Sequence, residues 1–199
     1  MNDLFTELTK NINGDFVSQI ATKIGADESQ TKKMIDMALP IITQSLAKNS
    51  KTKSGAKKLE KALEKKHDGS VLESVSDLIQ HPEAGEGAGI LKHVLGKKLS
   101  KVEDTVASQA GVDKQQSGSV LKVLAPMVMG ALGKQKQLAG VDAKKIVSLL
   151  ENANEKMKDP NNSFVMDLAT AILDKDKDGD IKDDLLNMAK KTLQSFFKK

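Results

Sequence analysis

The sequence predicts an all-α fold: a multihelical array of two pseudo-symmetric modules, then a C-terminal helix–loop–helix with an EF-hand-like acidic loop. Three observations predict this architecture. Apolar residues recur three and four positions apart along most of the chain, which is the period of an amphipathic helix. No segment shows the β-branched alternation that is typical of a strand. A pattern of stop glycine, helix cap and proline occurs twice, and 199 residues leave room for one or two domains.

The N-terminal module contains three predicted helices. Residues 3–12 carry their apolar side chains on one helical face, and a second short helix stops at Gly25, as a C′ glycine predicts. Asp27 and Gln30 form the capping-box pattern at the start of the third helix. Pro40 falls inside the apolar repeat of this helix, so it either kinks the helix or occupies the first turn of a new one.

The same pattern returns at a constant offset of 86 residues, the separation of Gly25 from Gly111. The second copies of the glycine, the two capping residues and the proline are Gly111, Asp113, Gln116 and Pro126. Apolar positions of the helices align at the same offset. We interpret the repeat as an internal duplication of a helical module of about 45 residues, and not as a short-period solenoid.

The duplication divides the chain into four predicted parts. They are module A at 1–50, a basic helix with a degenerate loop and a connector at 51–88, module B at 89–138, and C-terminal helices with an acidic metal loop at 139–199. Within these parts we expect a short helix over 71–79, a flexible connector over 81–89, a linker over 135–140 and a helix over 142–157.

The acidic loop, residues 174–185, reads DKDKDGDIKDDL and follows the opening of an EF-hand calcium loop. Alternating aspartates can wrap carboxylates around one hard cation, and Gly179 permits the sharp turn. The predicted ligands are Asp174, Asp176, Asp178, the main-chain carbonyl of Asp180, and a closing carboxylate from Asp184 or Asp183. Leu185 stands where an EF-hand has its bidentate glutamate, so we expect weaker coordination of Ca²⁺, with Mg²⁺ as the alternative ion. The competing interpretation is a solvated acidic turn that caps the next helix.

A degenerate copy of this loop lies in the middle segment, residues 51–88. The residues that align with the ligand positions of the acidic loop are Glu64, Lys66, Asp68 and Glu73. Because Lys66 places an ammonium group where a ligand is needed, we predict a metal-free loop in which Asp68 and Gly69 have turn and capping roles. The alternative is that Lys66 swings outward and the three carboxylates bind a cation weakly.

The composition narrows the classes of partner. All 31 basic residues are lysines, the net charge is +4, and the chain contains no cysteine, tyrosine or tryptophan. Without arginine and with few aromatic residues, base recognition and stacking are disfavoured, so we do not expect a nucleic-acid partner. The lysines that could contact phosphates nonspecifically are Lys57, Lys58, Lys61 and Lys65. The alternative for these four is a solvated helix face.

The sequence predicts neither an enzyme nor a small-molecule substrate. The absence of cysteine excludes disulfides, thiolate zinc sites and cysteine nucleophiles. His67, His81 and His93 match no metal-ligand helix motif, and the glycine-rich residues 85–89 lack the features of a phosphate loop. The start of the chain has no apolar signal core, and the longest apolar stretch is too short for a membrane span. We therefore expect a cytoplasmic protein without a transmembrane segment, a removed leader being the alternative.

Several segments together resemble one known family. They are the HDGS sequence at 67–70, GILKHVLG at 89–96, LAPMVMGAL at 124–132, and the late DxDxDG loop. The chain resembles, over nearly its whole length, the bacterial domain-of-unknown-function-937 (YidB-like) family. The resemblance implies a helical bacterial protein without an assigned activity, and it supplies no catalytic residue. The family pattern in the middle loop is a fuller aspartate set, from which Lys66 departs.

The leading functional hypothesis is a non-catalytic helical protein with one structural calcium-type site that acts through contacts with a protein partner or through self-association. The exposed apolar area expected around Pro40 and Pro126 is the predicted interface. The alternative is a lysine-rich module that binds nucleic acid or an anionic surface nonspecifically. A third hypothesis is membrane attachment through the amphipathic residues 186–199.

Overall fold

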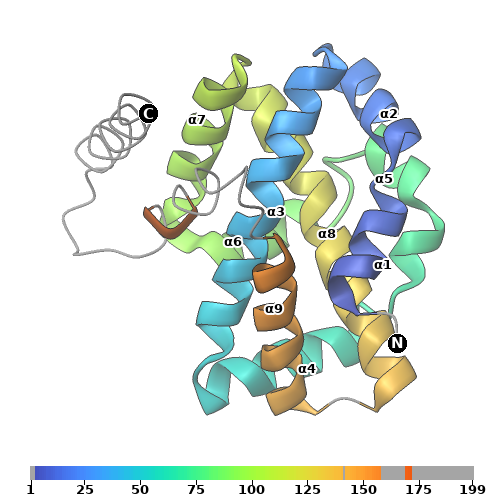
Figure 1. The fold of residues 1–199 in the computed structure, drawn as a ribbon, viewed down its shortest axis with the longest axis vertical. Coiled ribbons are helices and arrows are strands. Elements are labelled where there is room, and N and C mark those ends of the chain that lie inside the picture. The colour runs from blue at the N-terminus through green and yellow to red at the C-terminus, as the bar shows by residue number, and fades with distance from the viewer. Residues whose placement is uncertain (1–2, 141, 158–168, 172–199) are drawn as a thin grey trace, which may run out of the picture.

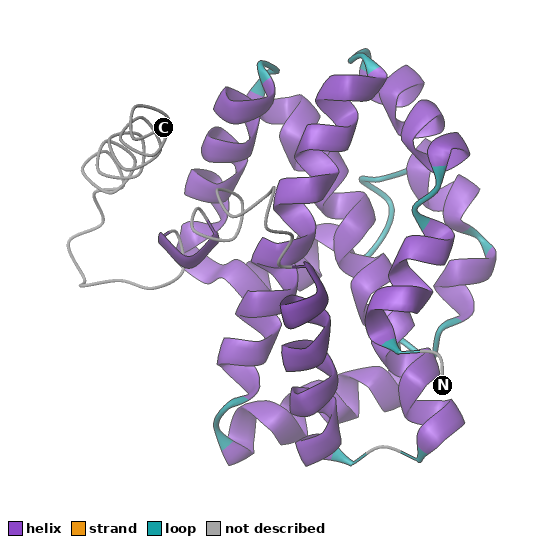
Figure 2. Cartoon of the chain, viewed as in Figure 1, coloured by secondary structure: helices purple, strands orange, loops and turns teal. Residues whose placement is uncertain are grey.

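The regular structure of the chain is helical throughout the residues that the computed structural model describes, 3–140, 142–157 and 169–171 (Figure 1; Figure 2). The helices are α1 (Leu4–Asn11), α2 (Gly14–Ile24), α3 (Glu28–Ser50), α4 (Lys53–Lys65), α5 (Val75–Gln80), α6 (Gly87–Leu95), α7 (Leu99–Ala110), α8 (Lys114–Ala139) and α9 (Ala143–Met157). Two short 3₁₀ turns, η1 (Ser70–Glu73) and η2 (Gly96–Lys98), lie between them. The predicted all-α class is confirmed for this part of the chain.

The core is organised around the two long helices α3 and α8, which run side by side through the middle of the molecule (Figure 1). Residues 123–133 of α8 are all buried, as expected for a helix that is apolar on every side. Helices α1, α6 and α7 pack against α8, and α9 packs against α3. The result is one connected core that contains residues of both predicted modules.

The caps of α3 and α8 form as the sequence predicts. At α3 the Asp27 carboxylate accepts from the Gln30 main-chain N–H at 2.7 Å, and the Gln30 side chain accepts from the Asp27 N–H at 3.2 Å. The corresponding distances between Asp113 and Gln116 are 2.8 and 2.9 Å. Both preceding stop glycines are left-handed, with φ values of 69° and 71°, which a glycine adopts without steric cost.

Both prolines lie in the interior of continuous helices, Pro40 in α3 and Pro126 in α8. Of the two interpretations of Pro40, a new helix beginning at the proline is therefore wrong. Each proline lacks an amide hydrogen, so one carbonyl of the preceding turn loses its intrahelical partner. Packing of the long helices against their neighbours stabilises them despite this loss.

The predicted linker over 135–140 is wrong, because α8 continues to Ala139 and ends at the left-handed Gly140. Ion pairs hold this last stretch against other helices. The Lys134 Nζ lies 2.8 Å from the Glu7 carboxylate of α1, and the Lys136 Nζ lies 2.9 Å from Glu64 of α4. Such long-range pairs leave no signal in the local sequence pattern.

Two boundaries before α6 also differ from the prediction. The helix expected over 71–79 is two pieces, η1 and α5, separated at Ser74. The connector expected over 81–89 ends at Glu86, because α6 already begins at Gly87. A Cβ at Gly87 would clash with the main-chain carbonyl of Lys122 in α8. This glycine therefore allows close helix packing, whereas its surroundings in the sequence suggested flexibility.

Candidate functional site

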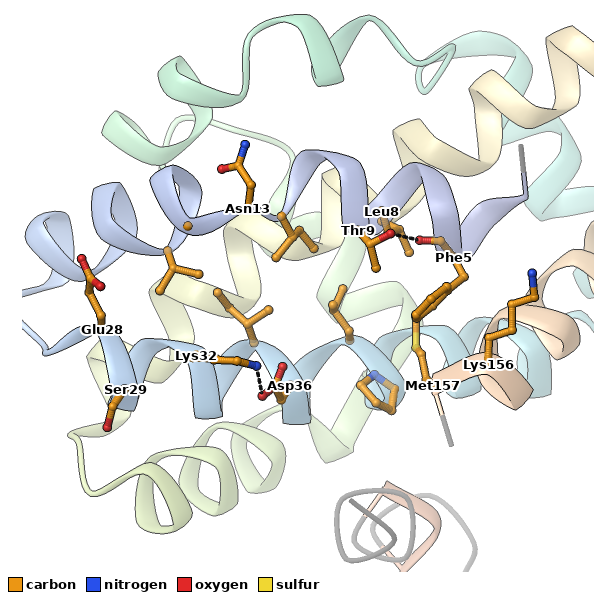
Figure 3. Close-up of a pocket in the computed structure, with 16 residues that line it drawn as sticks. Phe5, Leu8, Thr9, Asn13, Glu28, Ser29, Lys32, Asp36, Lys156 and Met157 are labelled. Carbon is orange, nitrogen blue, oxygen red and sulfur yellow. Dashed lines mark hydrogen bonds and ion pairs between the residues drawn. The ribbon is translucent and has the colours of Figure 1, made fainter. Parts of the chain in front are cut away.

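An open groove lies between α1 and α2 on one side and α3 on the other, and we refer to it as the α1–α3 groove (Figure 3). Its volume is about 770 Å³. The apolar side chains that line it are Phe5, Leu8, Ile12, Val17, Ile35, Leu39, Pro40 and Met157. Most of them are only partly buried, although they also pack against the core. A row of half-covered apolar side chains is therefore open to solvent.

Charged and polar side chains surround this apolar floor. Lys32 and Asp36 form an ion pair of 2.7 Å on the α3 rim, and Glu28 lies further along the same helix (Figure 3). At the other end Lys156 of α9 pairs with Asp3, which also caps α1 by accepting from the Thr6 N–H at 3.0 Å. The hydrogen bond from Lys156 lowers the pKa of the Asp3 carboxyl below its usual value. An apolar floor with a charged rim is the geometry that receives an amphipathic helix.

The interface expected around the two prolines is only partly consistent with this geometry. Pro40 forms part of the groove wall. Pro126 lies within the fully buried stretch of α8, so the expected exposed apolar area around it is wrong. Pro126 has no surface role in the described structure.

The degenerate loop between α4 and η1 is closed by contacts within the protein. The Lys66 Nζ lies 3.2 Å from the Glu86 carboxylate, and Glu64 pairs with Lys136. The Asp68 carboxylate accepts from the main-chain N–H and the hydroxyl of Ser70, at 3.0 and 2.7 Å, and these bonds lower the pKa of Asp68. Gly69 is left-handed, with a φ of 107°.

This arrangement separates the four residues that were aligned with metal ligands. Asp68 and Gly69 occupy turn positions of the kind expected from the sequence, and Glu73 is exposed at the end of η1. Within the described part of the chain, no three acidic or histidine side chains are grouped so that they could hold a metal ion. The metal-free state of the loop stays a prediction.

The loop also packs directly against α8, a contact that sequence reasoning missed. A Cβ at Gly133 would clash with the main-chain carbonyl of His67, and a Cβ at Gly130 would clash with the side chain of Val71. The signal that could have indicated this contact is the pair of glycines three positions apart on a buried helix, because such a spacing lets another backbone approach closely.

The four lysines considered for phosphate contacts all lie exposed on α4. The Thr52 hydroxyl caps this helix, and Ala56, Leu59 and Leu63 form its buried face. No ion pair links these lysines to carboxylates of the described residues. The solvated face and the phosphate-binding face both fit this arrangement.

The predicted calcium ligands and the C-terminal amphipathic segment lie outside the described residues. This applies to all of residues 174–185 and 186–199. For the residues that the structure does describe, no helix is long and apolar enough to cross a membrane.

Comparison with known proteins identifies a family for most of the described helices. The family described as "bacterial protein of unknown function (DUF937)" matches residues 6–135, which extend from α1 into the last turns of α8. Neither the curated proteins nor the solved structures contain a match. The match includes both capping boxes, the degenerate loop, and the part of the α1–α3 groove that α1, α2 and α3 contribute.

Proposed function

The chain belongs to the DUF937 family of bacterial proteins of unknown function, and we propose that it is a non-enzymatic protein that acts through protein contacts. In this proposal the α1–α3 groove receives the apolar face of an amphipathic helix from a protein partner or from a second copy of the chain. The observation that carries the proposal is the row of half-buried apolar side chains in this groove. A contiguous set of partly exposed apolar side chains is typical of an interaction surface.

Photo-cross-linking tests this proposal in bacterial cells that express the full chain. A photo-reactive phenylalanine analogue at position 5 should cross-link to another polypeptide, because Phe5 faces the groove (Figure 3). The same analogue at the exposed Lys33, outside the groove, serves as the control. Leu39→Lys should abolish the cross-link from position 5, because it places a charge on the apolar floor. Cross-links from position 5 that join only residues of the same chain would contradict the proposal.

The proposal includes two pseudo-symmetric modules that stabilise each other. Both modules have the same type of helix cap, at α3 and at α8. The pseudo-symmetry is further supported by a pair of reciprocal hydrogen bonds between the two halves. The Gln30 side-chain amide donates to the Gly111 carbonyl at 2.9 Å, and the Gln116 amide donates to the Gly25 carbonyl at 3.2 Å. Each cap glutamine thus contacts the stop glycine of the other module, which is the exchange that a two-fold relation between the modules predicts.

The proposal also includes a structural calcium site formed by the aspartates of residues 174–184. Its support is the DxDxDG spacing alone, because oxygen ligands at alternate positions are those that Ca²⁺ prefers. Calcium should raise the melting temperature and give a measurable heat of binding, and Asp176→Ala should abolish both effects. Lys175→Ala, a change at a neighbouring position that supplies no ligand, should leave both intact. Equal responses of the two variants would contradict the assignment.

The second candidate function is nonspecific binding of an anionic polymer or surface by α4. The observation that favours it is the set of exposed lysines without ion pairs to described residues, Lys57, Lys58, Lys61 and Lys65. Changing these four to glutamine should remove salt-sensitive retention on heparin. The matched control changes four exposed lysines on other helices, Lys10, Lys23, Lys33 and Lys92. An equal loss in both variants would show that only net charge matters.

A further inference from the structure

A second cavity lies between the end of α3, the length of α4 and α6, and we refer to it as the α4–α6 pocket. Its volume is about 800 Å³, a size typical of small-molecule sites. The Asn49 side chain of α3 donates to the Val94 carbonyl of α6 at 2.9 Å, which joins two of its walls. The α1–α3 groove shares no lining residue with this pocket, so the proposed partner contact does not use it.

The pocket has an apolar body. Leu46, Leu59, Ala62, Ile90 and Met129 line it, and they come from four different helices. Met129 belongs to the fully buried stretch of α8, so this wall is rigid and continuous with the core. An aliphatic or other apolar group in this space would leave water and contact a preformed surface.

One end of the pocket is electropositive. It contains the N-terminus of α4 and, one turn further along, Lys58. The Thr52 hydroxyl accepts from the Gly55 N–H at 3.0 Å, so the Ser54 N–H is the amide at this end that has no intrahelical acceptor. Lys58 has no carboxylate partner within the described residues. Ser50, which is only 3% exposed, adds a hydroxyl to the lining at this end. A carboxylate or phosphate group matches this arrangement, because it can accept hydrogen bonds from an ammonium group, amides and hydroxyls.

The other end of the pocket contains the largely buried side chain of His67. His67 is only 8% exposed, and its imidazole forms no hydrogen bond to the described residues. Its Nε2 lies 3.6 Å from the Glu86 carboxylate, beyond hydrogen-bond distance, while that carboxylate pairs with Lys66 at 3.2 Å. Burial lowers the pKa of His67, which favours the neutral ring that can both donate and accept. Besides this contact with Glu86, the neutral ring keeps hydrogen-bonding capacity that a ligand in the pocket can use.

From these features we propose that the α4–α6 pocket binds a small organic anion with an apolar body and a hydrogen-bonding group at its far end. The anionic group contacts Lys58 and the N-terminus of α4, the body lies against Leu59 and Ile90, and the distal group contacts His67. Lys58 belongs to α4, whereas His67 follows the last residue of this helix, Lys65. An extended ω-hydroxy carboxylate of medium chain length carries an anionic group and a hydroxyl at the two ends of one apolar body.

Calorimetric titration of the full chain with ω-hydroxydecanoate, decanoate and decanol tests this inference. We expect saturable binding at one site, with the hydroxy acid binding most tightly and the neutral alcohol most weakly. Lys58→Gln should weaken binding of both acids about tenfold, because a charge-assisted hydrogen bond is lost. Lys57→Gln is the matched control, since Lys57 is the exposed neighbour that does not line the pocket. Equal affinities of these two variants would overturn the proposal.

Two further variants separate ligand binding from folding. In Ala62→Met, the longer side chain fills the pocket from α4, and methionine has a high helix propensity. This variant should therefore lose binding of both acids but keep a cooperative thermal transition. His67→Leu should remove the preference for the hydroxy acid over decanoate, because the hydrogen-bond partner of the hydroxyl is lost. The pocket would not be the binding site if the heat of titration of the wild type did not saturate. The same would follow if Ala62→Met bound the acids as tightly as the wild type.

Discussion

Gly133 shows how a single hydrogen atom in place of a side chain decides the packing of the middle loop. A Cβ atom at this position of α8 would clash with the main-chain carbonyl of His67, and a backbone atom has little freedom to move away. We predict that Gly133→Ala destabilises the protein by about 2–3 kcal/mol through overpacking. Chemical denaturation followed by circular dichroism measures the change.

Gly118 provides the matched control because it lies on the same helix. A Cβ there would only make an ordinary contact of 3.4 Å with the Glu103 side chain. Gly118→Ala should be neutral or stabilise by up to about 1 kcal/mol, since alanine has the higher helix propensity. If both variants were destabilised alike, the close approach at Gly133 would not be the cause.

The ion pair between Asp3 and Lys156 predicts a dependence of stability on pH. The hydrogen bond from Lys156 is the chief cause that lowers the folded-state pKa of Asp3 below the ordinary value of an aspartate. A lowered carboxyl pKa contributes stability that is present above the unfolded-state pKa and is lost as the pH falls through the folded-state pKa. The stabilising contribution of Asp3 should therefore be present at neutral pH and disappear in acid below the usual aspartate pKa.

Asp3→Asn isolates this charge, because asparagine is an equally good N-cap for α1. A double-mutant cycle with Lys156→Ala, measured by denaturation at neutral and acidic pH, gives the coupling between the two side chains. A coupling that is equal at both pH values would refute an ionic contribution.

At the scale of the helices, the two cap glutamines each have two separable roles. The Gln116 side-chain oxygen accepts from the Asp113 N–H, while its amide donates to the Ile24 and Gly25 carbonyls of the other half. Glutamate at position 116 retains the capping box but loses the donor. We predict that Gln116→Glu destabilises the protein by about 1–2 kcal/mol.

Gln30→Glu should have a similar but smaller effect, because Gln30 donates only to the Gly111 carbonyl across the halves. Gln115→Glu, at the exposed neighbouring position, is the control and should change stability little. If Gln116→Glu were as stable as the control, the bonds across the halves would contribute nothing measurable to folding.

The sequence predicted features that depend on neighbouring residues. The caps at Asp27 and Asp113 and the stop glycines follow from residues within one or two turns, so their local pattern is sufficient. Features that join distant segments were not predicted. The contact of Gly133 with His67 and the extension of α8 past Gln135 both depend on partners far away in the sequence. The α4–α6 pocket likewise needs helices from separate parts of the chain, and the α1–α3 groove joins three consecutive helices to Lys156 and Met157 of α9.

For the whole molecule, these long-range contacts predict that the two halves fold together. Helix α3 packs against α2 of its own half and against α7 and α8 of the other, and Glu7, which is 2% exposed, pairs with Lys134 at the far end of α8. Separating the halves would expose the apolar faces of α3 and α8 and leave Glu7 without its partner. We predict one thermal transition, with calorimetric and van't Hoff enthalpies that agree.

A split chain provides the stricter test of this cooperativity. Fragments 1–86 and 87–199 should each lack a cooperative transition on their own, because each exposes the surface that the other covers in the whole chain. Mixing them should restore helical circular dichroism and a single transition whose midpoint rises with concentration. Two resolved transitions in the whole chain, or a cooperative transition in either fragment alone, would instead show that the halves are independent domains joined by a connector.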